Sequence, residues 1–168
     1  MELCTGGDLT SRKLSEPEVV VVVEQILRAL AYMHRRRVVH HNLKLENILY
    51  ESKKPDATIR LIDFGLSQAY DRAEVSHKAV GTAYTLSPEI ASKTGTYTDR
   101  SDIWALGVCA WVLLAGDFPF IRTEADLSDK FKLNRLINAT YKFGITWSKL
   151  LLQLIRWYTY LSLTYCTH

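Results

Sequence analysis

Two polar residues, far apart in the sequence, could together bind a metal ion. Asn47 directly precedes the apolar run Ile48–Tyr50, and Asp63 directly follows a second short run, residues 58–62. The polar segment 52–56 separates the runs, as expected for the turn between two strands of a hairpin. If the strands pair, Asn47 and Asp63 meet at the open end, where their side-chain oxygens are ligands of the kind that Mg²⁺ prefers. The simpler alternative, that Asn47 is a turn former and nothing more, stays open on these residues alone.

A series of short motifs surrounds these two residues in a fixed order. Residues 40–47 (HHNLKLEN) come first and residues 63–65 (DFG) follow. Three further motifs come next: 81–84 (GTAY), 87–89 (SPE) and 101–104 (SDIW). The ordered set resembles the protein kinase family, with its catalytic loop H-R-D-L-K-x-x-N, its D-F-G motif and its A-P-E motif. The order and separation of the motifs, rather than any single tripeptide, carry this resemblance.

The resemblance implies a role for each polar residue of the catalytic loop. Asn42 stands where the family has the Asp that accepts the proton of the substrate hydroxyl. Lys44 would neutralise the γ-phosphate, and a lysine there is typical of kinases that act on serine and threonine. Asn47 and Asp63 would hold Mg²⁺, and Glu46 would pair with a basic residue of the substrate.

The start of the chain resembles the family's hinge segment, which binds adenine. By that resemblance, backbone groups of Glu2 and Cys4 would meet adenine, and Asp8 would meet the ribose hydroxyls. Leu49 would pack beneath the adenine ring. The residues expected around ATP and Mg²⁺ are Glu2, Cys4, Asp8, Lys44, Glu46, Asn47, Leu49 and Asp63.

Residues 63–89 resemble an activation loop. Thr82 would be its substrate-facing threonine, and residues 87–89 match A-P-E with serine in place of alanine. Further on, Asp102 resembles the helix residue that braces the backbone of the catalytic loop. The site residues expected in the loop are Thr82, Ser87, Pro88 and Glu89.

The catalytic loop departs from the family pattern at two positions. The amide of Asn42 cannot take a proton near neutral pH, and its NH₂ group is a donor where an acceptor is wanted. Loss of a general base lowers reaction rates by ~10²–10⁴. His41 replaces the arginine that docks a phosphorylated activation loop, and Lys78 occupies the region of the usual phosphothreonine, so no arginine clamp is required. Ser76 and Thr82 remain candidates for phosphorylation.

The first predicted helix has a clear start. Ser15 can act as the N-cap, Glu18 occupies the reciprocal capping-box position, and Pro17 is tolerated in a first turn. We expect the helix over residues 19–34, because apolar residues continue at helical spacing beyond the five consecutive valines. The basic cluster 34–37 (HRRR) is expected at its C-terminus, where cations complement the helix dipole; a targeting signal is the alternative.

Residues 103–115 are apolar on every side, which predicts a central helix surrounded by protein and stopped by residues 116–119 (GDFP). Residues 124–139 are expected to form an amphipathic helix. The fold class is therefore α+β and mostly helical: the large C-terminal lobe of a protein kinase, with a short β-hairpin beside the catalytic loop. Residues 116–120 (GDFPF) and 141–147 resemble the calcium/calmodulin-dependent group of kinases.

The resemblance extends from residue 1 to 149 and defines the expected domain. No G-x-G-x-x-G loop and no V-A-I-K strand occurs, so the family's small lobe is expected to be absent from this chain. Residues 150–168 form a divergent tail, for which truncation and mistranslation are the two explanations considered.

The composition excludes several other classes of protein. Apolar residues make up 48% and charged residues 23%, which argues against disorder, and the net charge of +3 is too small to indicate nucleic acid as a partner. Three widely spaced cysteines give no readable disulfide framework or zinc site. No apolar run reaches the ~20 residues of a membrane-spanning helix, and no signal peptide is readable. We expect a cytoplasmic protein, with a nuclear location as the alternative.

These observations predict a serine/threonine protein kinase by family, which transfers phosphoryl groups from ATP with Mg²⁺ to protein hydroxyls. Its activity is expected to be impaired by Asn42 and by the missing small lobe. The alternative is a pseudokinase that binds a nucleotide or a partner protein without turnover. A truncated product that folds poorly is the third interpretation.

Overall fold

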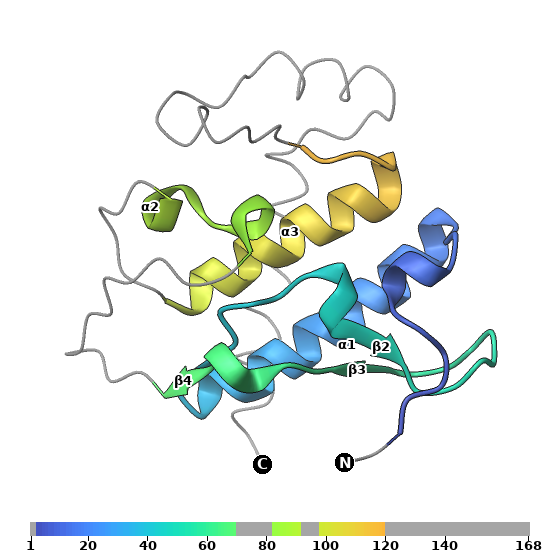
Figure 1. The fold of residues 1–168 in the computed structure, drawn as a ribbon, viewed down its shortest axis with the longest axis horizontal. Coiled ribbons are helices and arrows are strands. Elements are labelled where there is room, and N and C mark those ends of the chain that lie inside the picture. The colour runs from blue at the N-terminus through green and yellow to red at the C-terminus, as the bar shows by residue number, and fades with distance from the viewer. Residues whose placement is uncertain (1–2, 70–81, 92–97, 120–168) are drawn as a thin grey trace.

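The computed structural model describes residues 3–69, 82–91 and 98–119 (Figure 1). Two long helices dominate this part of the chain, α1 (Glu16–Arg35) and α3 (Asp99–Ala115), and they pack against each other. The remaining helix and the strands are short: α2 (Pro88–Ala91), β1 (Val38–Val39), β2 (Ile48–Tyr50), β3 (Ile59–Leu61) and β4 (Gln68–Ala69).

Helix α1 confirms the helix expected over residues 19–34 and extends it at both ends. The backbone N–H of Ser15 donates to Oε2 of Glu18 at 2.7 Å, which is one half of the predicted capping box. Val20 and Val21 are 55% and 56% exposed, whereas the valines on either side of them are buried. The valine run is therefore helical because the buried stripe continues along the whole helix, and packing overrides strand propensity.

The predicted hairpin is also confirmed. Strands β2 and β3 are antiparallel, with Ile48 opposite Leu61 and Tyr50 opposite Ile59. The backbone N–H of Ile62 donates to the carbonyl of Asn47 at 2.9 Å, so the last hydrogen bond of the hairpin lies beside the two predicted metal ligands.

The buried central helix is observed as α3, which begins at Asp99, four residues before the predicted start. Its residues from Ser101 to Trp111 are buried except Trp104. The helix ends at Ala115 and is capped by Gly116, whose φ of +70° is the left-handed conformation that glycine adopts without strain. Because α3 is apolar on all sides, it packs against α1 on one side and the segment around Tyr84 on another.

One strand pair was not predicted. Strand β1 follows α1, and it pairs antiparallel with β4, which follows the D-F-G residues; Val39 lies opposite Gln68. Two-residue strands carry too little periodicity to be recognised in a sequence. The pair matters because it ties the loop after β1 to the segment after Asp63. The helix expected over residues 124–139 and the tail 150–168 lie outside the described residues.

Candidate active site

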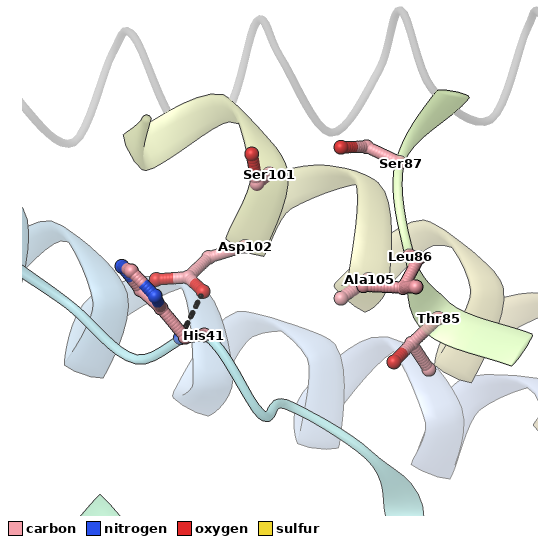
Figure 2. A pocket seen from close by; sticks show the side chains of 7 residues that line it. All are labelled: His41, Thr85, Leu86, Ser87, Ser101, Asp102 and Ala105. Atoms are coloured by element: carbon pink, nitrogen blue, oxygen red, sulfur yellow. Dashed lines mark hydrogen bonds between the residues drawn. The ribbon is translucent and has the colours of Figure 1, made fainter. Parts of the chain in front are cut away.

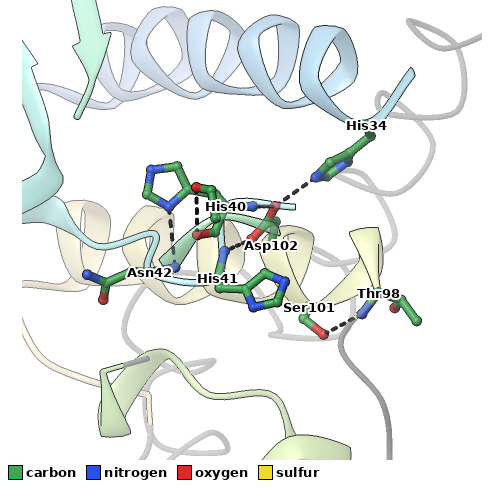
Figure 3. Close-up of polar contacts among 8 residues, drawn as sticks. His34, His40, His41, Asn42, Thr98, Ser101 and Asp102 are labelled. Carbon is green, nitrogen blue, oxygen red and sulfur yellow. Dashed lines mark hydrogen bonds and ion pairs between the residues drawn. The ribbon is translucent and has the colours of Figure 1, made fainter. Parts of the chain in front are cut away.

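A buried carboxylate on α3 organises the loop that follows β1 (Figure 3). Asp102 is 1% exposed; its Oδ2 accepts the backbone N–H of His40 at 2.8 Å, and its Oδ1 accepts that of His41 at 3.1 Å. Oδ2 also lies 2.7 Å from Nε2 of His34, in the last turn of α1. The φ of His41 is +68°, a conformation that residues other than glycine rarely adopt, so these bonds hold a strained stretch of backbone. Asp102 thereby joins α1, α3 and the loop.

The ring of His40 connects the same loop to the end of β3. The backbone N–H of Asn42 donates to its Nδ1 at 3.3 Å, and its Nε2 lies 3.1 Å from the carbonyl oxygen of Ile62. A neutral ring with its hydrogen on Nε2 satisfies both contacts. The hydroxyl of Ser67 donates to the carbonyl of His40 at 3.2 Å. Since Ile62 directly precedes Asp63, the ring fixes the separation between Asn42 and Asp63.

The side chains of Asn42, Asn47 and Asp63 meet at the open end of the hairpin. Nδ2 of Asn42 donates to Oδ2 of Asp63 at 2.8 Å, and Nδ2 of Asn47 lies 3.3 Å from the same oxygen. Nδ2 of Asn47 also donates to the carbonyl oxygen of Asn42 at 2.8 Å. Both asparagines are buried, 7% and 6% exposed, while Asp63 is exposed and has left-handed backbone with φ +63°. The hairpin therefore brings Asn47 and Asp63 together, as predicted, and Asn42 joins them.

Thr82, from the predicted activation loop, joins this group. Its hydroxyl donates to Oδ1 of Asn42 at 2.9 Å. The carbonyl of Thr82 accepts both the backbone N–H of Thr85, at 3.0 Å, and the Thr85 hydroxyl, at 3.1 Å. Asn42 thus accepts from Thr82 with its oxygen and donates to Asp63 with its nitrogen. Both ends of its amide are engaged.

The chemistry of this group fits a divalent cation that is shared with a phosphate. Asp63 supplies a carboxylate and Asn47 supplies an amide oxygen, and both are hard ligands suited to Mg²⁺. Within the described residues no group of three or more His, Cys, Asp and Glu side chains forms a protein-only metal site. Mg²⁺ in phosphate-transfer sites is bound by one or two carboxylates together with phosphates and water, and Asp63 and Asn47 are residues of the kind that could hold it.

His41 lines a small pocket between the loop, the segment 85–87 and the start of α3 (Figure 2). Burial lowers the pKa of the His41 imidazole, and the carboxylate of Asp102 opposes that effect. His41 is therefore neutral near pH 7, unlike the permanently charged arginine of the family pattern. Ser87, 2% exposed, lines the same pocket, and its hydroxyl lacks a hydrogen-bond partner there. His41 and Ser87, which replace the arginine and the alanine of the family pattern, thus line the same pocket.

The segment expected to be the hinge runs along β2. Asp8 forms an isolated antiparallel bridge with Leu49, and the backbone N–H of Gly6 donates to the carbonyl of Tyr50 at 3.1 Å. A Cβ atom on Gly6 would lie 2.2 Å from the carbonyl oxygen of Ser52, so this approach requires glycine. The carboxylate of Asp8 accepts the backbone N–H of Thr10 at 2.9 Å and caps the turn Leu9–Ser11.

Glu46 lies at a different point from the metal ligands. Its carboxylate accepts the hydroxyl of Tyr84 at 2.6 Å, and the Tyr84 ring packs against Phe118 with ring centroids 4.8 Å apart. Burial, followed by the hydrogen bond to Glu46, raises the pKa of Tyr84. The tyrosine thus stays a donor and holds the exposed carboxylate of Glu46 at the surface.

The order of the motifs and the network around Asp63 agree with one family. The family model described as the protein kinase domain matches residues 1–161. This chain belongs to the protein kinase domain family. The kinase domain is 42% identical to CDPK-related kinase 8 of Arabidopsis thaliana over 134 residues, which cover 76% of this chain and 22% of that protein. It is 36% identical to human calcium/calmodulin-dependent protein kinase type IV over 152 residues, which cover 88% of this chain and 31% of that protein.

The resemblance to the serine/threonine kinases of the calcium/calmodulin-dependent group is therefore confirmed. The chain spans less than a third of the length of these relatives, with 22% and 31% covered. None of the helices in the described part of the kinase domain has the length and apolarity needed to cross a membrane.

The structure brings some of the predicted site residues together and leaves others apart. Asn42, Asn47, Asp63 and Thr82 form one network, Asp8 and Leu49 adjoin on the hinge side, and Glu46 meets Tyr84. Cys4 and Lys44 are half-buried, and Pro88 begins α2, which also contains Glu89. Glu2 and the side chain of Glu89 lie outside what the structure describes.

The structural roles of the histidines and of Tyr84 were not predicted from the sequence. His34 belongs to the basic cluster 34–37, yet it is only 6% exposed and contacts Asp102. A signal was present, because His34 lies four residues after the buried Leu30 and eight after the buried Ile26, on the inner face of α1. The contacts of His40 and Tyr84 join segments that are distant in sequence, and local spacing does not reveal them.

Proposed function

We propose that this chain is the hinge and part of the large lobe, over residues 1–149, of a serine/threonine protein kinase whose phosphoryl transfer is impaired. Bound ATP with Mg²⁺ would supply the phosphoryl group and neutralise its developing charge. The family match and the calcium/calmodulin-dependent relatives support the reaction class. The substrate is a protein hydroxyl, of serine or threonine.

The roles of the metal-side residues follow from their chemistry and position. Asp63 and Asn47 would hold Mg²⁺, and the buried position of Asn47 supports a fixed rather than a mobile ligand. Lys44 would provide a positive charge to the γ-phosphate. The hinge-side bridge between Asp8 and Leu49 supports a nucleotide that lies across β2, with Leu49 beneath the adenine.

The substrate side rests on Glu46. Its carboxylate is exposed and fixed by Tyr84, which supports pairing with a basic residue of a peptide. The hydrogen bond from Tyr84 occupies part of the acceptor capacity of the Glu46 carboxylate, so we propose a preference for basic residues rather than an absolute requirement.

The observation that carries the proposed impairment is the amide of Asn42. Its oxygen accepts the hydroxyl of Thr82 and its nitrogen donates to Asp63, so the group at the base position has no free basic site. A substrate hydroxyl placed there would find an amide that cannot take its proton near neutral pH. Positioning and charge neutralisation would remain, because these roles belong to other residues.

The test compares phosphate transfer by wild type, Asn42→Asp and Asp63→Ala in the longest native form of the protein. Transfer of radiolabelled phosphate from ATP to a peptide with a basic residue and one serine gives the rate. We expect Asn42→Asp to raise kcat by ~10²–10⁴. Asp63→Ala should abolish transfer, both alone and when combined with Asn42→Asp. No gain with Asn42→Asp, in a protein that binds ATP, contradicts the proposed role of Asn42.

A second candidate function is a nucleotide- or protein-binding module without turnover. The side-chain amide of Asn42 favours this function, because its hydrogen bonds to Asp63 and Thr82 stabilise the folded site without contributing to catalysis. Binding of a fluorescent ATP analogue by wild type, together with no transfer by Asn42→Asp, would support this second function over the first.

A further inference from the structure

One side of helix α1 carries apolar and charged side chains at the surface, at the regular spacing of a helix. Val20 and Val21 are 55% and 56% exposed, and Tyr32, three turns further on, is 53% exposed. Two adjacent exposed valines differ from apolar side chains that are scattered singly over a surface. We call this side of the helix the α1 stripe, and its members are Val20, Val21, Glu24, Arg28, Tyr32 and Arg36.

The charges of α1 are divided between its two halves. The acidic residues, Glu16, Glu18 and Glu24, all precede the first basic residue, Arg28. The helix dipole accounts for charges in the terminal turns, but its effect falls off within one turn and does not reach the middle of the helix. Glu24 and Arg28 lie in that middle part. Their own ion pair, at 2.7 Å, has side chains that are 34% and 50% exposed, and such surface pairs contribute little to stability.

A second copy of α1 in antiparallel orientation complements this division of charge. When two identical helices pack across a two-fold axis, the first half of each lies against the second half of the other. With the axis midway between Glu24 and Arg28, Glu24 of each copy faces Arg28 of the other. The same symmetry places Val20 of each copy opposite Tyr32 of the other. The stripe is therefore complementary to itself in both charge and apolar character.

We infer that the α1 stripe is a self-association surface, and that its occupant is a second copy of this chain. Val20 and Val21 of each copy pack against the Tyr32 ring of the other, at two symmetric points. Two pairs of Glu24 with Arg28 join the copies between these points. The acidic first turn of each helix faces the basic C-terminal end of the other. The inference does not depend on phosphoryl transfer, because the stripe lies outside the candidate active site.

The apolar side chains of the stripe are ordered in the single chain. The guanidinium of Arg36 lies over the Tyr32 ring, 3.6 Å from its centroid, and Nη1 of Arg36 donates to the carbonyl of Tyr32 at 3.4 Å. Valine in a helix has one strongly preferred rotamer, so Val20 and Val21 are also restricted. Side chains that are already fixed lose less conformational entropy when a partner binds. This order favours association.

The length of the stripe indicates how strong the association is. From Val20 to Tyr32 the helix rises by about 18 Å. A standard interface buries about 800 Å² on each partner, which is more than a single helix contact of this length supplies. We therefore expect a reversible dimer that forms at high protein concentration, rather than an obligate one.

The experiment exchanges the central charges and measures association of the full chain by sedimentation equilibrium, over a concentration range of about a hundredfold. The forms are wild type, Glu24→Arg, Arg28→Glu and the double variant that carries both changes. Each single variant places like charges opposite each other at both central contacts, so it should be monomeric where wild type is dimeric. The double variant exchanges the two signs and should dimerise as wild type does.

An equimolar mixture of the two single variants is the decisive sample. In a mixed dimer, the arginine introduced at position 24 of one chain faces the glutamate introduced at position 28 of the other. At the second contact, the unchanged Arg28 of the first chain faces the unchanged Glu24 of the second. We expect the mixture to dimerise although neither variant does so alone, and no effect within a single chain produces that result. Both variants keep a net positive charge, starting from the +3 of wild type, so general attraction does not explain it either.

Two further variants complete the set. Lys53→Glu makes the same change of charge as Arg28→Glu at an exposed position in the hairpin turn, and it should leave the Kd of the dimer unchanged. Val20→Ser combined with Val21→Ser removes apolar contact and should raise that Kd about tenfold or more. Because both valines are exposed, this variant tests the surface even if a charge variant fails to fold.

Three results would overturn the inference. The first is a wild-type chain that stays monomeric at every concentration. The second is a dimer whose Kd is the same in both single charge variants, because its interface would then lie elsewhere. The third is a mixture of the two variants that stays monomeric. None of these results bears on the proposed function, which is tested by phosphate transfer in Asn42→Asp.

Discussion

The structure predicts that the carboxylate of Asp102 is one of the largest single contributors to the stability of the kinase domain. It is 1% exposed and accepts hydrogen bonds from the backbone N–H groups of His40 and His41. Its third contact, with His34, is to a side chain that is itself 6% exposed. Asp102→Ala would leave three donors without their acceptor in a region that excludes water.

The magnitude follows from the number of orphaned groups. Each buried donor without an acceptor destabilises the fold by ~1–3 kcal/mol. The three losses share one carboxylate and are not additive, so we expect about 3–5 kcal/mol in total. That is a large fraction of the ~5–15 kcal/mol by which native domains are stable.

Urea unfolding of the full chain, followed by tryptophan fluorescence, measures this loss. Trp104 and Trp111 lie on the same helix as Asp102 and report its packing. With a slope of ~1–3 kcal/mol per molar urea, the transition midpoint should fall by about 2 M. Asp99→Asn, at the first turn of the same helix, is the matched control, because it removes a carboxylate that is not buried and should lower stability by ~0.3–1 kcal/mol.

A cycle with His34→Ala separates the contact between His34 and Asp102 from the backbone contacts of Asp102. If the loss in Asp102→Ala arises mainly from the backbone N–H groups, His34→Ala alone should destabilise less than Asp102→Ala, with a coupling energy of ~0.5–3 kcal/mol between the two sites. An unchanged midpoint and slope in Asp102→Ala would refute the assignment of Asp102 as the organising residue of the loop.

Three further predictions follow from other sites. Burial holds the pKa of His41 below its ordinary value, so the unfolded state binds a proton first and the folding stability falls as pH drops through about 6.5. His41→Asn should therefore make Tm less dependent on pH between pH 7 and 5. A variant with the same pH profile of Tm as wild type would contradict this prediction. Burial raises the pKa of Cys109 to about 12, so its thiol should not react with an alkylating reagent in the folded chain. Peptide mapping after alkylation in native buffer should find Cys4 labelled, and Cys109 labelled only after unfolding. Equal labelling of the two cysteines in native buffer would count against a buried thiol. Gly6→Ala would place a Cβ atom 2.2 Å from the carbonyl oxygen of Ser52. The variant should lose ~1–3 kcal/mol of folding stability, measured by thermal unfolding. A variant with the Tm of wild type would show that the hinge segment does not approach β2 so closely.

The parts of the fold that the sequence predicted are those with local signals. Residues at positions 15 and 18 marked the start of α1, the unbroken apolar run marked α3, and Gly116 marked its end. The hairpin was predicted from two apolar runs and a polar turn, and with it the meeting of Asn47 and Asp63. Each of these signals lies within about one element of the feature that it predicts.

The parts that were not predicted depend on contacts between distant segments. The pairing of β1 with β4, the contact of His34 with Asp102 and the hydrogen bond of Tyr84 to Glu46 join residues separated by dozens of positions. The position of His34 on the inner face of α1 indicates that it is buried, but nothing in local spacing identifies Asp102 as its partner. Motif resemblance supplied the roles of the site residues, and the structure supplied the hydrogen bonds that Asn42 makes.

The most direct test of the account concerns the side-chain amide of Asn42. In an ¹⁵N-labelled chain, its two NH₂ signals can be assigned by their loss in Asn42→Asp. We expect resolved signals with slowed exchange against solvent in EDTA, because one hydrogen is donated to Asp63 from a buried asparagine. We also expect a scalar coupling across that bond to the ¹³C-labelled Asp63 carboxylate. Fast-exchanging signals without such coupling would contradict the central claim that Asn42 holds Asp63 in the folded kinase domain.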